Sequence, residues 1–161
     1  MDGTTQRTSP KDVFMHLLAI LALYVSVISF LALIFQIINI YFPDPVEEGP
    51  YFDPTYYYEA IRWSVAALIV IFPVFIATSW MLNKSYLQTP SKRDLRIRKW
   101  LIYFTLFLAA IVIIVDLVTL IYYLLQGGLT ARFILKVLTV LATSGAVFGY
   151  YYMDLRKFKT E

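Results

Sequence analysis

The segment IVIIVDLVTLIYYLL, residues 111–125, is a run of apolar side chains with one carboxylate, Asp116, in its middle. A charged side chain at the centre of a bilayer costs about 2.5–3.5 kcal/mol even on translocon-insertion scales. The segment is part of a longer apolar stretch at about residues 98–126, and about 20 apolar residues are enough to span a bilayer. It therefore predicts a transmembrane helix that carries one ionisable group.

The whole chain has the composition of an integral membrane protein. Of its 161 residues, 60% are hydrophobic and 16% are charged, and the mean hydropathy is +0.67. A soluble domain of this size needs a polar exterior and cannot bury so much apolar surface. Cysteine is absent, which excludes disulfides and cysteine-ligated metals. Residues 1–12 are a poor signal peptide because they mix acids with bases and lead into an overlong apolar stretch, so we expect a retained helix.

The fold that we predict is an all-α bundle of four transmembrane helices in a single domain, residues 1–161. Ser9 and Asp12 flank Pro10 in the pattern of a capping box at the start of the first helix. Asp53 and Thr130 are expected to cap the second and fourth helices. The helices should cover about residues 10–41, 54–83, 98–126 and 131–155.

The basic residues predict the orientation. Eleven of the fourteen lie in the N-terminal tail, in the link at residues 84–99 and in the C-terminal tail. If the chain crosses the membrane four times, these three segments lie on the same side. The positive-inside rule makes that side cytoplasmic, so the topology should be N-in/C-in. The opposite loop, residues 43–53, carries only acids. We expect it to be a solvated loop, because the spacing of its acids matches no calcium loop.

The basic link is also the expected contact with lipid. Anionic headgroups attract bases near the surface at about 1 kcal/mol each, so nucleic-acid binding is not needed to explain the net charge. A homo-oligomer or a membrane-protein partner is left open. The expected headgroup contacts are Lys92, Arg93, Arg96, Arg98 and Lys99.

Asp116 lies on a polar stripe of the third helix that also includes Thr119. The same spacing in the fourth helix gives a stripe that contains Lys136. Because the glycines at 127–128 form a short turn, the two helices should be antiparallel, which brings Lys136 to within about 4.5 Å of the level of Asp116 along the axis. We therefore predict an intramembrane Asp116–Lys136 pair, in which a nearby ammonium keeps the carboxylate ionised.

Two roles for this pair stay open: a structural contact that fixes how two helices dock, or part of a proton or ion relay. Pairing of Asp116 with Arg62 is an alternative. Further polar side chains fall in the same outer half of the membrane and could line a small polar cavity, or could simply bond across helices at about 0.6 kcal/mol each. These residues are Gln36, Asn39, Arg62, Thr119 and Thr139.

Pro73 removes a backbone donor and should kink the second helix. Gly145 and Gly149 permit close contact between backbones, which we expect inside the bundle, with dimerisation as the alternative.

No motif indicates catalysis. No phosphate loop, metal-ligand cluster or nucleophile constellation is present, and His16 is the only histidine, so a haem held by two histidines of one chain is excluded. We expect no enzymatic activity, no catalytic residue, no metal and no cofactor.

Several segments resemble an uncharacterised bacterial family of four-helix integral membrane domains, over residues 9 to 156 in all. They include SPKDVFMHLLAILALYVSVISF (9–30), IRWSVAALIVIFPVF (61–75), RIRKWLIYFTLFLAA (96–110), DLVTLIYYLLQGGLTARFILKVLTVL (116–141) and GAVFGYYYMDLR (145–156). The resemblance implies the fold and a bacterial source, but no activity. We therefore expect a multi-pass protein of the bacterial inner membrane.

Two hypotheses for the function follow. The first is a small structural or accessory membrane protein that acts through helix–helix or lipid contacts. The alternative is a small oligomeric transporter or channel that uses the Asp116–Lys136 pair as a relay.

Overall fold

The computed structural model describes the backbone of residues 7–44 and 48–159, and the side chains as far as Arg156. In this part of the chain the long helices are α1 (Pro10–Tyr41), α2 (Thr55–Gln88), α3 (Arg96–Gln126) and α4 (Ala131–Lys159), and no strand is found there. A short 3-10 helix, η1 (Pro90–Asp94), joins α2 to α3. All four long helices are long and apolar enough to cross a membrane. The predicted all-α membrane fold is confirmed, and the chain is a multi-pass membrane protein.

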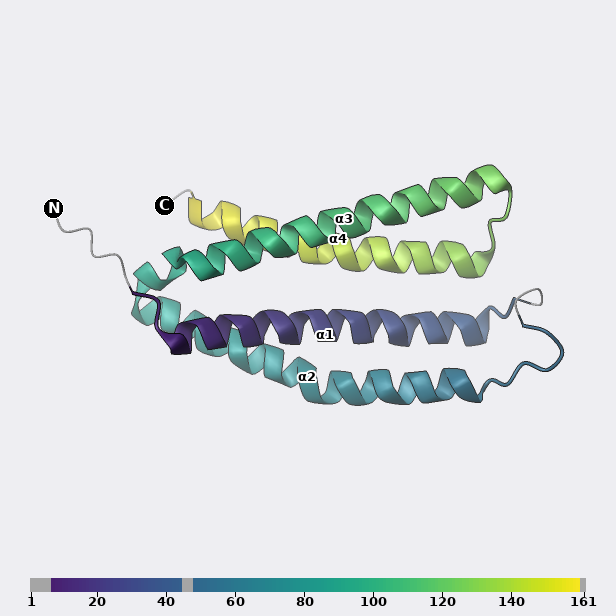
Figure 1. The fold of residues 1–161 in the computed structure, drawn as a ribbon, viewed down its shortest axis with the longest axis horizontal. Helices are drawn as coiled ribbons and strands as arrows, with labels where there is room; N and C mark the ends of the chain where they lie inside the picture. The colour runs from purple at the N-terminus through teal and green to yellow at the C-terminus, as the bar shows by residue number, and fades with distance from the viewer. Residues whose placement is uncertain (1–6, 45–47, 160–161) are drawn as a thin grey trace.

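The helices form two antiparallel hairpins, α1–α2 and α3–α4, that lie side by side (Figure 1). Within each hairpin the two helices pack on each other, while α1 also contacts α4 and α3. α1 is therefore the helix that joins the hairpins. We call the end with the start of α1, η1 and the end of α4 the termini end, and the end with the two hairpin connections the loop end. The N-in/C-in orientation stays a prediction.

The ends of the helices follow local capping chemistry. The Ser9 hydroxyl accepts from the backbone N–H of Asp12 at 3.2 Å, and the Asp12 carboxylate accepts from that of Ser9 at 3.3 Å, which confirms the capping box. Asp53 accepts from the N–H of Thr55 at 2.9 Å, but the N-cap residue of α2 is Pro54, so Asp53 is not the cap that we expected. Thr130 accepts from the N–H of Phe133 at 3.2 Å, as expected of a cap. α3 ends at Gln126 and is followed by the C-cap Gly127, whose φ of 72° is easily reached only by glycine.

Three helices extend past the expected bounds. α2 continues to Gln88 rather than ending near residue 83, and α3 begins at Arg96 rather than near 98. Nothing in residues 83–88 stops a helix, and the first residue that cannot continue one with a full set of hydrogen bonds is Pro90. α4 likewise continues to Lys159 rather than ending near 155. The polar last turns of α2 therefore project beyond its apolar part and reach the first turns of α1.

The interior face of α1 is made of small side chains. Ala19, Ala22, Ser26 and Ser29 are buried at alternating steps of three and four residues, and small residues let membrane helices approach closely. A second link joins the hairpins: Thr105 of α3, only 2% exposed, is hydrogen-bonded to the Tyr24 hydroxyl of α1 at 2.7 Å. The core therefore lies along α1.

α2 changes direction about midway along its length (Figure 1). Pro73 lies inside the helix, where it removes one hydrogen bond and its ring crowds the preceding turn. We attribute the bend to this proline.

Candidate functional site

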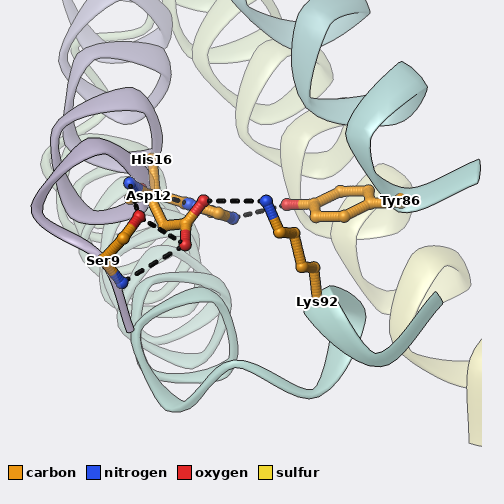
Figure 2. Close-up of polar contacts among 5 residues, drawn as sticks. All are labelled: Ser9, Asp12, His16, Tyr86 and Lys92. Atoms are coloured by element: carbon orange, nitrogen blue, oxygen red, sulfur yellow. Dashed lines mark hydrogen bonds and ion pairs between the residues drawn. The ribbon is translucent and has the colours of Figure 1, made fainter. Parts of the chain in front are cut away.

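Polar residues of the termini end converge where the first turns of α1 meet the last turns of α2 (Figure 2). Beside the capping box of Ser9 and Asp12, Lys92 of η1 forms an ion pair with Asp12, with Nζ 3.4 Å from Oδ1. One turn further along α1, His16 is hydrogen-bonded to Tyr86 of α2 at 2.5 Å. These five residues, which we call the α1–α2 junction, fasten the open end of the first hairpin.

The hydrogen bonds of His16 define its tautomer. Its Nδ1 lies 2.6 Å from the carbonyl oxygen of Asp12, and a carbonyl can only accept, so Nδ1 carries a hydrogen. In the neutral imidazole Nε2 is then an acceptor, and the Tyr86 hydroxyl donates to it. His16 is 5% and Tyr86 7% exposed. Nε2 therefore joins α1 to α2, while Nδ1 is bonded within α1 and fixes the orientation of the ring.

Tyr86 also connects the junction to the second hairpin. The guanidinium carbon of Arg98 lies 5.3 Å from the centroid of the Tyr86 ring, and that of Arg93 lies 6.0 Å away, both within range of a cation–π interaction. Arg98 of α3 is buried and donates to Asp154 of α4 at 2.7 Å. A cavity of about 100 Å³ lies between the hairpins here, and Tyr150 contributes to its wall.

A second buried ionic cluster lies at the loop end. Arg132, near the start of α4, forms an ion pair with Glu48 of the α1–α2 connection, and their side chains are 7% and 11% exposed. The same guanidinium donates to the carbonyls of Phe42 at 2.7 Å and Asn39 at 3.0 Å. Tyr57 of α2 donates to Glu48 at 2.9 Å. Arg132 thus satisfies carbonyls at the end of α1 while it neutralises a buried carboxylate.

The electrostatics of the loop end follow from these bonds. Hydrogen bonds from Arg132 lower the pKa of Glu48 below its ordinary value, against the opposing effect of desolvation. Hydrogen bonds from Thr55 lower the pKa of Asp53 in the same way. The expectation of a solvated acidic loop is therefore wrong for Glu48, because α4 brings a buried arginine to it. Glu47, another of the loop acids, lies outside the described residues.

The described part of the chain contains no group of three His, Asp or Glu side chains that could hold a metal ion. Residues 12–151 match the model of a family described as a domain of unknown function, DUF5671. The chain belongs to the DUF5671 family. No curated protein and no solved structure matches the chain.

The predicted Asp116–Lys136 pair is not formed among the described residues of this DUF5671 protein. Oδ2 of Asp116 is buried and has no hydrogen-bond partner there, while Nζ of Lys136 lies 5.6 Å from the ring centroid of Phe35 on α1. The physical reason is that α4 packs against α1 as well as α3. Lys136 therefore turns toward the first hairpin rather than along the stripe shared with Asp116.

The other polar residues predicted at the outer level of the DUF5671 chain form no shared hydrogen-bond network among the described residues. Asn39 donates to Gln36 at 3.1 Å, one turn earlier in the same helix. Thr119 and Thr139 each donate at 2.8 Å to the carbonyl four residues earlier in their own helix. Arg62 is exposed. The hydroxyls are thus bonded within helices, not across them.

Gly145 and Gly149 are not at a close helix contact. A Cβ atom at either position would meet nothing within 4 Å, so the expected packing inside the bundle is wrong. Association with a second copy through these glycines stays a prediction.

Most of the basic residues expected at lipid headgroups have partners inside the DUF5671 fold. Arg98 is an interior residue bonded to Asp154, and Lys99 is paired with Asp94 at 3.2 Å. Lys92 and Arg93 contact residues of the α1–α2 junction. Arg96 is exposed.

The site residues predicted from the sequence do not include Tyr86, Glu48 or Arg132. The role of Arg132 could have been suspected from the sequence. It is a basic residue close to the predicted helix cap Thr130, on the side of the membrane where the loop at residues 43–53 carries only acids. Nothing in the sequence marked Tyr86, because it lies beyond residue 83, where we expected the second helix to end.

Proposed function

We propose that this protein is a structural or accessory protein of the bacterial inner membrane. It acts through contacts of its helices with lipids or with other membrane helices, and it neither conducts ions nor catalyses a reaction. The observation that supports this most directly is the position of two ion pairs whose arginines are buried. Arg98–Asp154 and Arg132–Glu48 lie at opposite ends of the bundle. The first joins α3 to α4, and its arginine also lies against Tyr86 of α2. The second braces α4 against the end of α1 and the connection that follows it.

The interior between these ends favours the same function. His16 and Asn39 are 23 residues apart on α1, a distance of about 35 Å along a helix. The buried positions of α1 between them are small side chains and one isoleucine: Ala19, Ala22, Ser26, Ser29 and Ile38. Such a face suits close helix packing better than a continuous path for ions.

The outer faces of the helices supply the surface for such contacts. In the most apolar window of each of α2, α3 and α4, only 11% of the residues are buried inside the chain. The remaining apolar surface faces lipid or partner helices once the protein is in a bilayer. The distribution of basic residues supports an orientation with the termini end in the cytoplasm.

Asp116 favours a second candidate function, a small oligomeric transporter or channel. Its Oδ2 atom is buried without a hydrogen-bond partner among the described residues, and intramembrane carboxylates often belong to proton or ion paths. In this alternative the carboxylate of Asp116 binds the ion, and Lys136, which lies over Phe35, is no longer its direct partner.

One assay separates the two candidates: dissipation of a pH gradient in proteoliposomes that contain the purified full chain. The variants are Asp116→Asn and, as a matched control, Asp94→Asn, which makes the same change in a side chain that is 79% exposed. We expect wild-type vesicles to lose the gradient no faster than protein-free vesicles. Flux that is lost in Asp116→Asn but kept in Asp94→Asn would overturn the accessory function and support the conduit.

A further inference from the structure

A groove of about 370 Å³ runs across the termini end between α1, α2 and η1. It lies beside the α1–α2 junction, and Ser9, Asp12 and Lys92 belong to both (Figure 2). Its rim is polar, with the hydroxyls of Ser9 and Ser85. It also has apolar lining residues, which are Met15, Trp80, Met81 and Leu82. The groove therefore offers a polar and an apolar surface to one occupant.

The polar part of the groove is positively charged. Lys11, Lys84 and Lys92 line it, together with one acid, Asp12. The carboxylate of Asp12 is already bonded to Ser9 and Lys92, and its side chain is 15% exposed. Lys11 and Lys84 form no ion pair with any described residue. Two positive charges are thus left to attract an anion.

The apolar part of the groove continues onto the outer face of α2. Trp80 is 63% exposed, and Nζ of Lys84 lies 5.3 Å from its ring centroid. Exposed Ile76 and Phe72 lie one and two turns before Trp80 on the same face. Tryptophan favours the membrane–water interface, where long lysine side chains reach toward the headgroups. These contacts put the lysines at headgroup depth with an apolar track below them.

We propose that this groove binds one anionic phospholipid, with its phosphate against Lys11, Lys84 and Lys92 and an acyl chain along Trp80 and the outer face of α2. A free phosphate ion would satisfy the lysines but would leave the apolar track unused, so the combined surface favours a lipid. The inference rests on the proposed function, because it gives the lipid contact of that function a site and a lipid class.

Trp80 allows a direct test, since it is the only tryptophan in the groove. Trp63 and Trp100 are both exposed, so they are replaced by phenylalanine to leave Trp80 as the sole tryptophan. The full chain is reconstituted in mixed vesicles of phosphatidylcholine and phosphatidylglycerol. Brominated acyl chains, which quench tryptophan on contact, are placed on one lipid or on the other at the same mole fraction.

We expect brominated phosphatidylglycerol to quench Trp80 more than brominated phosphatidylcholine does. The variant Lys11→Gln/Lys84→Gln should reduce this preference about five-fold for each lysine removed. The control Arg96→Gln/Lys99→Gln removes the same charge from exposed residues outside the groove and should keep the preference. Quenching is compared with the unquenched signal of each variant, which corrects for loss of the Lys84–Trp80 contact.

Three results would overturn the proposal: equal quenching by the two lipids, an equal loss of preference in the control variant, or loss of the preference when inorganic phosphate is added. The last result would identify a site for small anions instead. The proton-flux assay is independent of this test, so failure of the lipid site and failure of the accessory function can be told apart.

Discussion

Arg132 of α4 and Glu48 of the α1–α2 connection form a buried ion pair that also closes the end of α1. The arginine reaches the carbonyls of Asn39 and Phe42 in addition to the carboxylate. A planar guanidinium with five donors suits this task, because one side chain can satisfy several acceptors at once. The contact therefore brings together α1, α4 and the first hairpin connection.

Replacing Arg132 tests how much this contact stabilises the fold. Arg132→Met removes two charge-assisted hydrogen bonds to α1 carbonyls, each worth about 1.5–3 kcal/mol, and we expect the free energy of unfolding to fall by about 3 kcal/mol. Denaturant unfolding in detergent micelles measures it. Arg96→Met is the control, because Arg96 is exposed. A loss no greater than in the control would show that the cluster contributes little.

Glu48 should make stability depend on pH. Hydrogen bonds from Arg132 lower its pKa in the folded protein, so its contribution is fully present above the ordinary glutamate pKa of about 4.3. It is lost as the pH falls through the lowered folded pKa. We expect the melting temperature of the wild type to fall more steeply below about pH 5 than that of Glu48→Gln. Parallel curves for the two proteins would contradict this.

Tyr86→Phe removes the hydroxyl that donates to Nε2 of His16 and leaves a buried acceptor without its partner. Such a loss costs about 1–3 kcal/mol, so we expect the free energy of unfolding to fall by this amount. Tyr103→Phe, at a tyrosine that is 51% exposed, should change it little. Adding His16→Leu to Tyr86→Phe should recover part of the loss, because the unpaired nitrogen is then gone. Full additivity of the two changes would argue against the hydrogen bond.

Asp116 and Lys136 should behave as independent sites. No ion pair joins them in the described part of the chain, and Lys136 lies over Phe35 instead. In a double-mutant cycle with Asp116→Asn and Lys136→Met, we expect the changes in unfolding free energy to add to within about 0.5 kcal/mol. A larger coupling energy would show that Asp116 and Lys136 interact, as the polar stripe predicted.

The helices and several of their ends were predictable because they depend on local sequence. Apolar length indicates a membrane span wherever it occurs, and Ser9 lies only three residues from its capping partner Asp12. Lys136 was misplaced for a physical reason: its stripe was matched to α3 alone, although α4 also packs against α1.

The candidate site was mostly not predictable because its contacts join distant residues. His16 and Tyr86 are 70 residues apart, and Arg132 and Glu48 are 84 apart. Periodicity within one helix identifies which residues share a face, but it does not identify the helix that the face meets.

Gly145 and Gly149 give a last prediction, which separates packing inside the chain from packing between copies. A Cβ atom at either position would meet nothing within 4 Å, and alanine is favoured over glycine inside a helix by about 0.5–1 kcal/mol. We therefore expect Gly145→Ala and Gly149→Ala each to raise the free energy of unfolding of the monomer. Gly127→Ala, at a φ of 72°, should lower it by about 1–2 kcal/mol. Cross-linking in proteoliposomes supplies the second measurement: if two copies associate through these glycines, the alanine variants lose the cross-linked dimer although each monomer is more stable. Lower stability of the monomer would instead mean that the glycines pack closely inside the chain after all.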